Sequence, residues 1–69
     1  MKEFNLDGSE FVALCDLLKL VDLVDSGAAA KHLIAEGKVK VDGNIELRKR
    51  CKIRPGQIVE FDGVEVKVF

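Results

Sequence analysis

The sequence predicts an α+β fold: a single small domain in which a short N-terminal strand and two helices pack on a small antiparallel sheet. The hydrophobic pattern supports this prediction. Apolar residues recur at helical spacing through the first half of the 69-residue chain, and from Lys38 onward they alternate with polar residues, as in half-buried strands. A chain of this length has room for one domain only, residues 1–69.

The N-terminal half is expected to form a strand and then two helices. Residues 2–6 alternate with period two and predict the strand. Ser9 is a suitable N-cap for the first helix, because its hydroxyl can accept from a free first-turn amide. Apolar residues then recur at helical spacing over 11–21, so we expect this helix to be largely buried. The second helix should begin near Ser26 and end at Gly37, where a left-handed residue would stop it.

The C-terminal half is expected to form antiparallel strands joined by tight turns. Asp42–Gly43–Asn44 is a strong hairpin signal, and Pro55–Gly56 and Asp62–Gly63 mark two further turns. The strand-like runs are 38–42, 45–47, 58–61 and 64–68. All four phenylalanines fall on apolar periods, so we expect them in the core, the terminal Phe69 excepted.

Charge is divided unevenly along a chain whose formal net charge is only −1. Residues 1–30 carry two basic and six acidic side chains, residues 31–54 eight and three, and residues 55–69 one and three. The middle third therefore has a net charge of +5, and five of its basic residues lie within 48–54. Such a patch can bind phosphate although the whole chain is almost neutral. The alternative is that these charges only solvate a surface.

The sequence contains no recognisable catalytic or metal-binding set, so we expect no enzyme, no cofactor and no metal. One histidine and two cysteines 36 positions apart cannot supply a four-ligand zinc site, and no nucleophile stands beside a base. Cys15 lies on an apolar stripe and reads as a core residue. Cys51 reads as an inert strand thiol, although its basic neighbours could lower its pKa, and a redox role for it stays open as an alternative.

The N-terminal residues and the hydropathy of the chain predict a cytoplasmic protein. No apolar run approaches the length of a membrane span, and residues 1–6 lack the pattern of a signal peptide. A secreted domain of this size would normally carry several cysteines as disulfides. We therefore expect no membrane partner, reduced thiols and a monomer.

The stretch from Val24 to Gly43, VDSGAAAKHLIAEGKVKVDG, resembles the core of the S-four-type RNA-binding domain, the alpha-L motif named for the fourth small-subunit ribosomal protein. That pattern, SG-x-x-AK-x-x-I-x-x-G-x-V-x-VNG, is followed by an Arg-rich segment and a K-(L/I)-x-x-GD-x-V turn and strand. The resemblance spans nearly the whole chain, with the alpha-L core at about residues 9–54, and is closest to small stand-alone, YbcJ-like members. The chain departs from the pattern at Ala28–Ala29, Asp42 and Gln57, where Gly-Glu, Asn and Asp are usual.

The resemblance implies that the second helix and the following hairpin form an RNA-facing surface. By position, the implied RNA-binding residues are Lys19, Ser26, Lys31, His32, Lys38, Arg48, Lys49, Arg50 and Lys52. Arg can donate two hydrogen bonds to one phosphate, and Lys supplies a point charge. The chain has no Trp or Tyr for stacking on single strands, so we expect recognition of structured RNA, ribosomal or transfer RNA, by phosphates and shape.

A protein-interaction module is the alternative from another functional class. In that interpretation an adaptor docks its acidic first third, or its basic middle, onto a ribosomal or RNA-processing protein. Nuclease treatment separates the two interpretations, because docking to protein would persist after RNA is removed.

Overall fold

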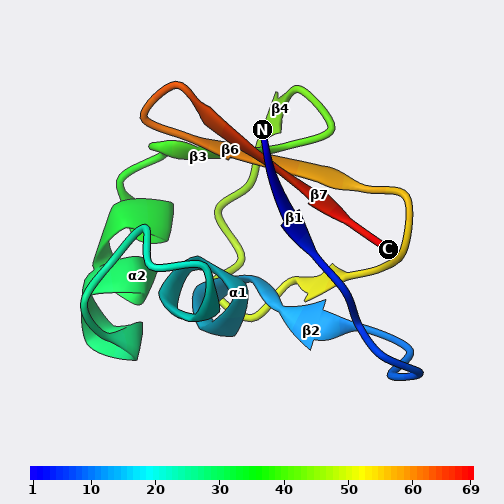
Figure 1. Cartoon of the computed structure of the whole chain (residues 1–69). Helices are drawn as coiled ribbons and strands as arrows, with labels where there is room; N and C mark the ends of the chain where they lie inside the picture. Colours follow the sequence, from blue (N-terminus) through cyan, green and yellow to red (C-terminus); the bar gives the residue numbers. More distant parts are fainter.

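Two helices lie side by side against one face of a five-stranded sheet in the computed structural model, which describes all 69 residues (Figure 1). The elements are β1 (Lys2–Phe4), β2 (Val12–Ala13), α1 (Leu14–Leu20), α2 (Gly27–Ala35), β3 (Val39–Val41), β4 (Asn44–Ile45), β5 (Lys52–Ile53), β6 (Ile58–Phe61) and β7 (Val64–Val68). The predicted α+β class, with two helices packed on a small sheet, is confirmed.

The five-stranded sheet has the order β1-β7-β6-β3-β4. Its pairs are antiparallel except at one edge, where β1 runs parallel to β7 with Lys2 opposite Val66 and Phe4 opposite Val68. Backbone hydrogen bonds at the end of β1 continue this pairing, from Leu6 N to Phe69 O at 2.6 Å and from Phe69 N to Phe4 O at 3.0 Å. The first and last strands of the chain are therefore neighbours.

The core lies between the helices and the sheet and is entirely apolar. Fifteen residues are buried, and none of them is polar or charged. The period-two pattern explains the contribution of the strands: Val39 and Val41 are buried while Lys40 between them is exposed. On the helices, Leu17 and Ile34 are fully buried. In so small a core, truncating a side chain such as Leu17 to alanine should cost about 2–5 kcal/mol.

Local signals correctly predicted the second helix and the hairpin after it. Ser26 caps α2, since its Oγ accepts from Ala29 N at 3.1 Å, and Gly37 follows the helix with φ +77°. The β3–β4 turn has positive φ at both Asp42 (51°) and Gly43 (84°). This conformation matches the twist of a two-residue hairpin.

The two departures from the S-four pattern at Asp42 and Gln57 contact each other. Asp42 Oδ2 accepts from Gln57 Nε2 at 3.2 Å, and its Oδ1 accepts from the backbone N–H of Ile58 at 2.9 Å. Gln57 in turn accepts from Arg54 N at 2.8 Å. The carboxylate of Asp42 therefore joins the β3–β4 turn to the start of β6.

The predicted start of the first helix at Ser9 is wrong. Residues 12–13 form β2, which pairs antiparallel with β5, and α1 begins only at Leu14. No side chain caps α1. Its first amides donate to carbonyls far along the chain, from Leu14 N to Cys51 O at 2.9 Å and from Cys15 N to Lys49 O at 3.1 Å. Tertiary contacts therefore satisfy two of the free N–H groups at this helix end.

The later start of α1 changes the surroundings of several predicted core residues. Phe11 precedes β2 and is 38% exposed, so its placement in the core is wrong. Leu20 at the end of α1 is also exposed, which makes the buried face narrower than expected. The return strand of the hairpin ends at Ile45, and Leu47 lies beyond it, exposed. Neither helix has the length and apolar character needed to cross a bilayer.

Candidate nucleic-acid interface

Residues 48–54, which we call the basic loop, run from the end of the β3–β4 hairpin through β5. The carbonyls of Lys49 and Cys51 accept from the first amides of α1, so the loop is held against the helix by its backbone. Its side chains line an open hollow of about 570 Å³, formed by Arg48, Arg50, Cys51, Lys52 and Arg54. Four of these five lining residues are basic, an arrangement that suits a phosphate group.

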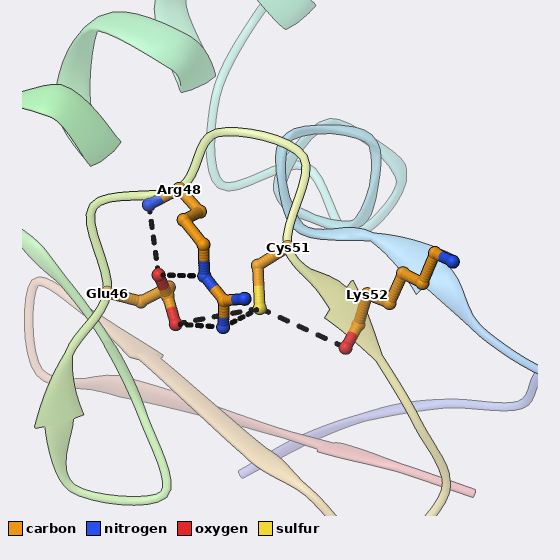
Figure 2. A network of polar contacts seen from close by, with 4 residues as sticks. All are labelled: Glu46, Arg48, Cys51 and Lys52. Carbon is orange, nitrogen blue, oxygen red and sulfur yellow. Dashed lines mark hydrogen bonds and ion pairs between the residues drawn. The ribbon is translucent and has the colours of Figure 1, made fainter.

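Glu46 holds Arg48 at one side of this hollow (Figure 2). Its Oε2 accepts from the Arg48 backbone N–H at 2.9 Å and from Nε at 3.0 Å, and its Oε1 accepts from Nη2 at 3.1 Å. This two-pronged geometry is the strong form of an Arg–carboxylate pair. The hydrogen bonds from Arg48 lower the pKa of Glu46 to about 2 from its ordinary 4.5 and raise the pKa of Arg48.

The thiol of Cys51 lies beside this pair. Arg48 Nη2 donates to its Sγ at 3.4 Å, and the thiol contacts Glu46 Oε1 at 3.6 Å. Burial raises the pKa of Cys51, and the negative charge of Glu46 raises it further. The basic neighbours of Cys51 favour a lowered pKa, but burial and Glu46 shift it in the opposite direction. A reactive thiolate is therefore disfavoured at neutral pH.

The ring of Phe11 lies close to two cations of the basic loop. Its ring centroid is 5.0 Å from Lys52 Nζ and 5.7 Å from Arg54 Cζ, within the range of cation–π attraction. The β2–β5 register explains the contact. Val12 pairs with Ile53, so the next residues outward, Phe11 and Arg54, meet at the end of this two-stranded ribbon.

Four of the five cations in the basic loop have no acidic partner. Only Arg48 has a carboxylate within 4.0 Å. The unpaired residues are Lys49, Arg50, Lys52 and Arg54. Their positive charge is therefore available to an anionic ligand, whereas the charge of Arg48 is offset by Glu46.

The predicted residues on and around α2 have different surroundings. His32 Nε2 lies 3.7 Å from Glu36 Oε2, and Lys38 Nζ lies 3.5 Å from Glu36 Oε1, so one carboxylate faces both. Lys31 is exposed on α2. Lys38 lines a second hollow, of about 510 Å³, with Leu33, Phe61 and Asp62.

Seven of the nine predicted site residues fall into two groups, and Lys19 and Ser26 lie apart from both. Arg48, Arg50 and Lys52 meet at the hollow of the basic loop, with Lys49 beside them in the same turn. Lys31, His32 and Lys38 belong to α2 and its C-terminal end, Lys19 is exposed in the last turn of α1, and the Ser26 hydroxyl oxygen accepts the capping bond of α2.

Sequence reasoning missed three residues that shape this surface. Arg54 follows Lys52 at the period-two spacing of a strand, which could have placed both on one face. Glu46 stands two residues before Arg48, a spacing that allows a local pair in a loop. No sequence signal pointed to Phe11, because its helical spacing with Leu14 and Leu18 suggested the core.

The two helices packed on the small sheet have the arrangement of an alpha-L motif, the fold of the S4 domain. The family model for the S4 domain matches residues 4–69, and the chain belongs to this family. It is 57% identical over 68 residues to the "Putative RNA-binding protein YbcJ" of Escherichia coli (strain K12), with 99% of this chain and 97% of that protein covered. The resemblance to small stand-alone, YbcJ-like members is confirmed.

Two further similarities agree with this assignment. The solution structure of E. coli YbcJ, described as revealing an alpha-L motif involved in RNA binding, matches with a TM-score of 0.76, covering 99% of this chain and 86% of that one. The chain is also 34% identical over 55 residues to the "Probable ribosome maturation protein RlbA" of Bacillus subtilis (strain 168), covering 80% of this chain and 78% of that protein.

Proposed function

We propose that this chain is a non-catalytic RNA-binding module that recognises structured RNA through the basic loop and the exposed face of α2. The observation that carries the proposal is the hollow whose lining includes Arg50, Lys52 and Arg54, three cations with no acidic partner. Membership of the S4 family and the RNA-binding description of YbcJ support it. The name of RlbA favours ribosomal RNA as the target class.

The remaining parts of the proposal follow from this chemistry. Phosphate oxygens are the expected ligands of the basic loop, because side chains cannot read the deep major groove of an RNA duplex. We propose that Lys31, His32 and Lys38 contact a second backbone segment, with Lys19 and Ser26 at its margin. We also propose that the chain acts as a monomeric domain in the cytoplasm, on ribosomal or transfer RNA.

Direct titration tests the proposal. Fluorescently labelled hairpins from ribosomal RNA, intact transfer RNA and an unstructured oligonucleotide of equal length are titrated at 50 and 200 mM salt, with heparin as competitor. We expect salt-sensitive binding that is tighter for the structured RNAs and survives heparin. The absence of binding at 50 mM salt would refute the proposal. Recovery of a protein partner from nuclease-treated extract would then favour the adaptor interpretation.

A further inference from the structure

Glu46 is an acidic residue at the edge of a surface that we propose binds an anion. Its side chain is only 18% exposed, whereas that of Arg48 is 77% exposed. The carboxylate accepts from the backbone and the side chain of Arg48 and contacts the Cys51 thiol. It therefore joins the first residue of the basic loop to the middle of the same loop.

The pairing leaves one part of the Arg48 guanidinium free. Nε and Nη2 donate to Glu46, and Nη2 also donates to Cys51 Sγ. The two N–H groups of Nη1 have no protein acceptor. Because the guanidinium is planar, holding its Nε/Nη2 edge fixes the direction in which Nη1 donates. Figure 2 shows the Lys52 side chain extending away from this cluster, and both Arg48 and Lys52 line the hollow.

We propose that the hollow is a preformed site for a backbone phosphate of RNA and that Glu46 is a positioning residue for it. This inference rests on the proposed function and adds the ligand group and the residue that orders the site. Glu46 acts through Arg48: it fixes the guanidinium and the turn of residues 48–51, so that little side-chain freedom is lost when phosphate binds.

A positioning role predicts that replacing Glu46 weakens RNA binding, whereas electrostatics alone predicts that it strengthens binding. Replacing Glu46 by Gln removes a negative charge near the RNA and should strengthen binding. Gln also loses the charged, two-pronged acceptor, because its amide nitrogen cannot accept from Arg48. The freed Arg48 side chain and loop must then be ordered during binding. If positioning dominates, Glu46→Gln should weaken binding by about 3- to 10-fold, on the scale of one or two immobilised side chains.

The experiment compares Glu46→Gln with Glu65→Gln, using the labelled ribosomal RNA hairpin that the wild-type chain binds. Glu65 is exposed on β7 and makes no ion pair, so its replacement changes the net charge equally without touching the loop. We expect Glu46→Gln to bind more weakly than wild type, and Glu65→Gln to bind as tightly as wild type or slightly more so. Thermal unfolding of both variants checks that each is folded.

A second pair of variants tests whether Glu46 acts through Arg48. If it acts through the guanidinium, Glu46→Gln weakens binding less in a chain that already carries Arg48→Gln, where only the backbone hydrogen bond to residue 48 and the contact with Cys51 remain to be lost. Equal weakening in both backgrounds, or tighter binding by the single Glu46→Gln variant, would overturn the inference while leaving RNA binding itself intact. Failure of the wild-type chain to bind any RNA would instead refute the proposed function.

Discussion

Removing the two charges at the tip of the basic loop should weaken RNA binding strongly without affecting the fold. Lys49 and Arg50 occupy an exposed turn, and their side chains make no hydrogen bond or ion pair within the protein. Only the Lys49 carbonyl is used, to accept from Cys15 N, and a glutamine at that position keeps it. The double variant Lys49→Gln/Arg50→Gln therefore isolates the contribution of the charges.

The size of the effect follows from the number of unpaired cations. If Lys49, Arg50, Lys52 and Arg54 each neutralise one phosphate, the slope of log K against log salt is about −3, since each contact contributes about 0.7–0.9. The double variant should have a slope of about −1.5. If the salt-independent part of binding is unchanged at 1 M, the affinity at 0.1 M should fall by about 30-fold.

Fluorescence anisotropy with the ribosomal RNA hairpin at five salt concentrations measures both quantities. Lys2→Gln/Lys67→Gln is the matched control, since both residues are exposed and lie on the paired strands β1 and β7 rather than on the basic loop. We expect the control to keep the wild-type slope and to bind within about 2-fold of wild type. Equal losses in the two double variants would show that net charge, and not the basic loop, determines binding, and no loss in the loop variant would refute the site.

Four further outcomes are expected from single changes. Phe11→Leu should weaken RNA binding by about 2- to 5-fold in the same assay, because leucine has no ring to attract the two loop cations. Phe11→Tyr keeps the ring and should bind like wild type; equal affinities of the two variants would show that the ring has no role in binding. Asp42→Ala should lower the melting temperature by about 8–16 °C, for about 2 kcal/mol lost with its hydrogen bonds to β6; a shift below 2 °C would contradict this role. Gly37→Ala should lower the free energy of unfolding by about 1–2 kcal/mol, because alanine is strained at this positive φ. RNA binding should stay unchanged, since the added methyl group meets its neighbours only at 3.8 and 3.9 Å; reduced affinity in a folded variant would contradict this. The pKa of Glu46 is lowered from 4.5 to about 2, so its pairing with Arg48 should stabilise the fold fully above pH 4.5 and be lost as the pH falls toward 2. The urea midpoints of wild type and Glu46→Gln should therefore converge in acid; a difference between the two midpoints that does not change with pH would be evidence against the pair.

The elements that were predictable from the sequence are those specified by neighbouring residues. Ser26 and Gly37 mark the two ends of α2 through local backbone geometry, and Asp42–Gly43 specifies a hairpin turn by the same means. The strict alternation in β7 likewise predicts which residues face the core. These parts of the fold needed no knowledge of distant contacts.

The N-terminal end of α1 could not be predicted because its partners lie in the second half of the chain. Ser9 has the chemistry of a cap, but Val12 and Ala13 pair with β5 instead of forming the first turn of a helix. The carbonyls of Lys49 and Cys51 then satisfy the amides that a side-chain cap would have satisfied. Phe11 is exposed for the same reason: it precedes a strand and does not lie on the buried face of a helix.

The candidate site was predictable in location but not in its internal pairing. A count of charges marks residues 48–54 as basic, and the structure gathers most of them around one hollow. The same count treats Arg48 as equivalent to Arg50, although Glu46 holds only the former. Side-chain pairing within a loop depends on its three-dimensional path, and period and composition carry no information about that path.

The position of β7 between β1 and β6 has a consequence for folding during synthesis. β7 follows β1 and β6 in the chain, yet it supplies the partner for both of these strands. A nascent chain that ends before Val64 leaves one edge of β6 without its hydrogen-bonded neighbour. β3, β4 and β6 can pair with one another before β7 is made, whereas β1 can join the sheet only after it. Until β7 is in place, the free edge of β6 leaves unfinished chains open to mispairing and proteolysis.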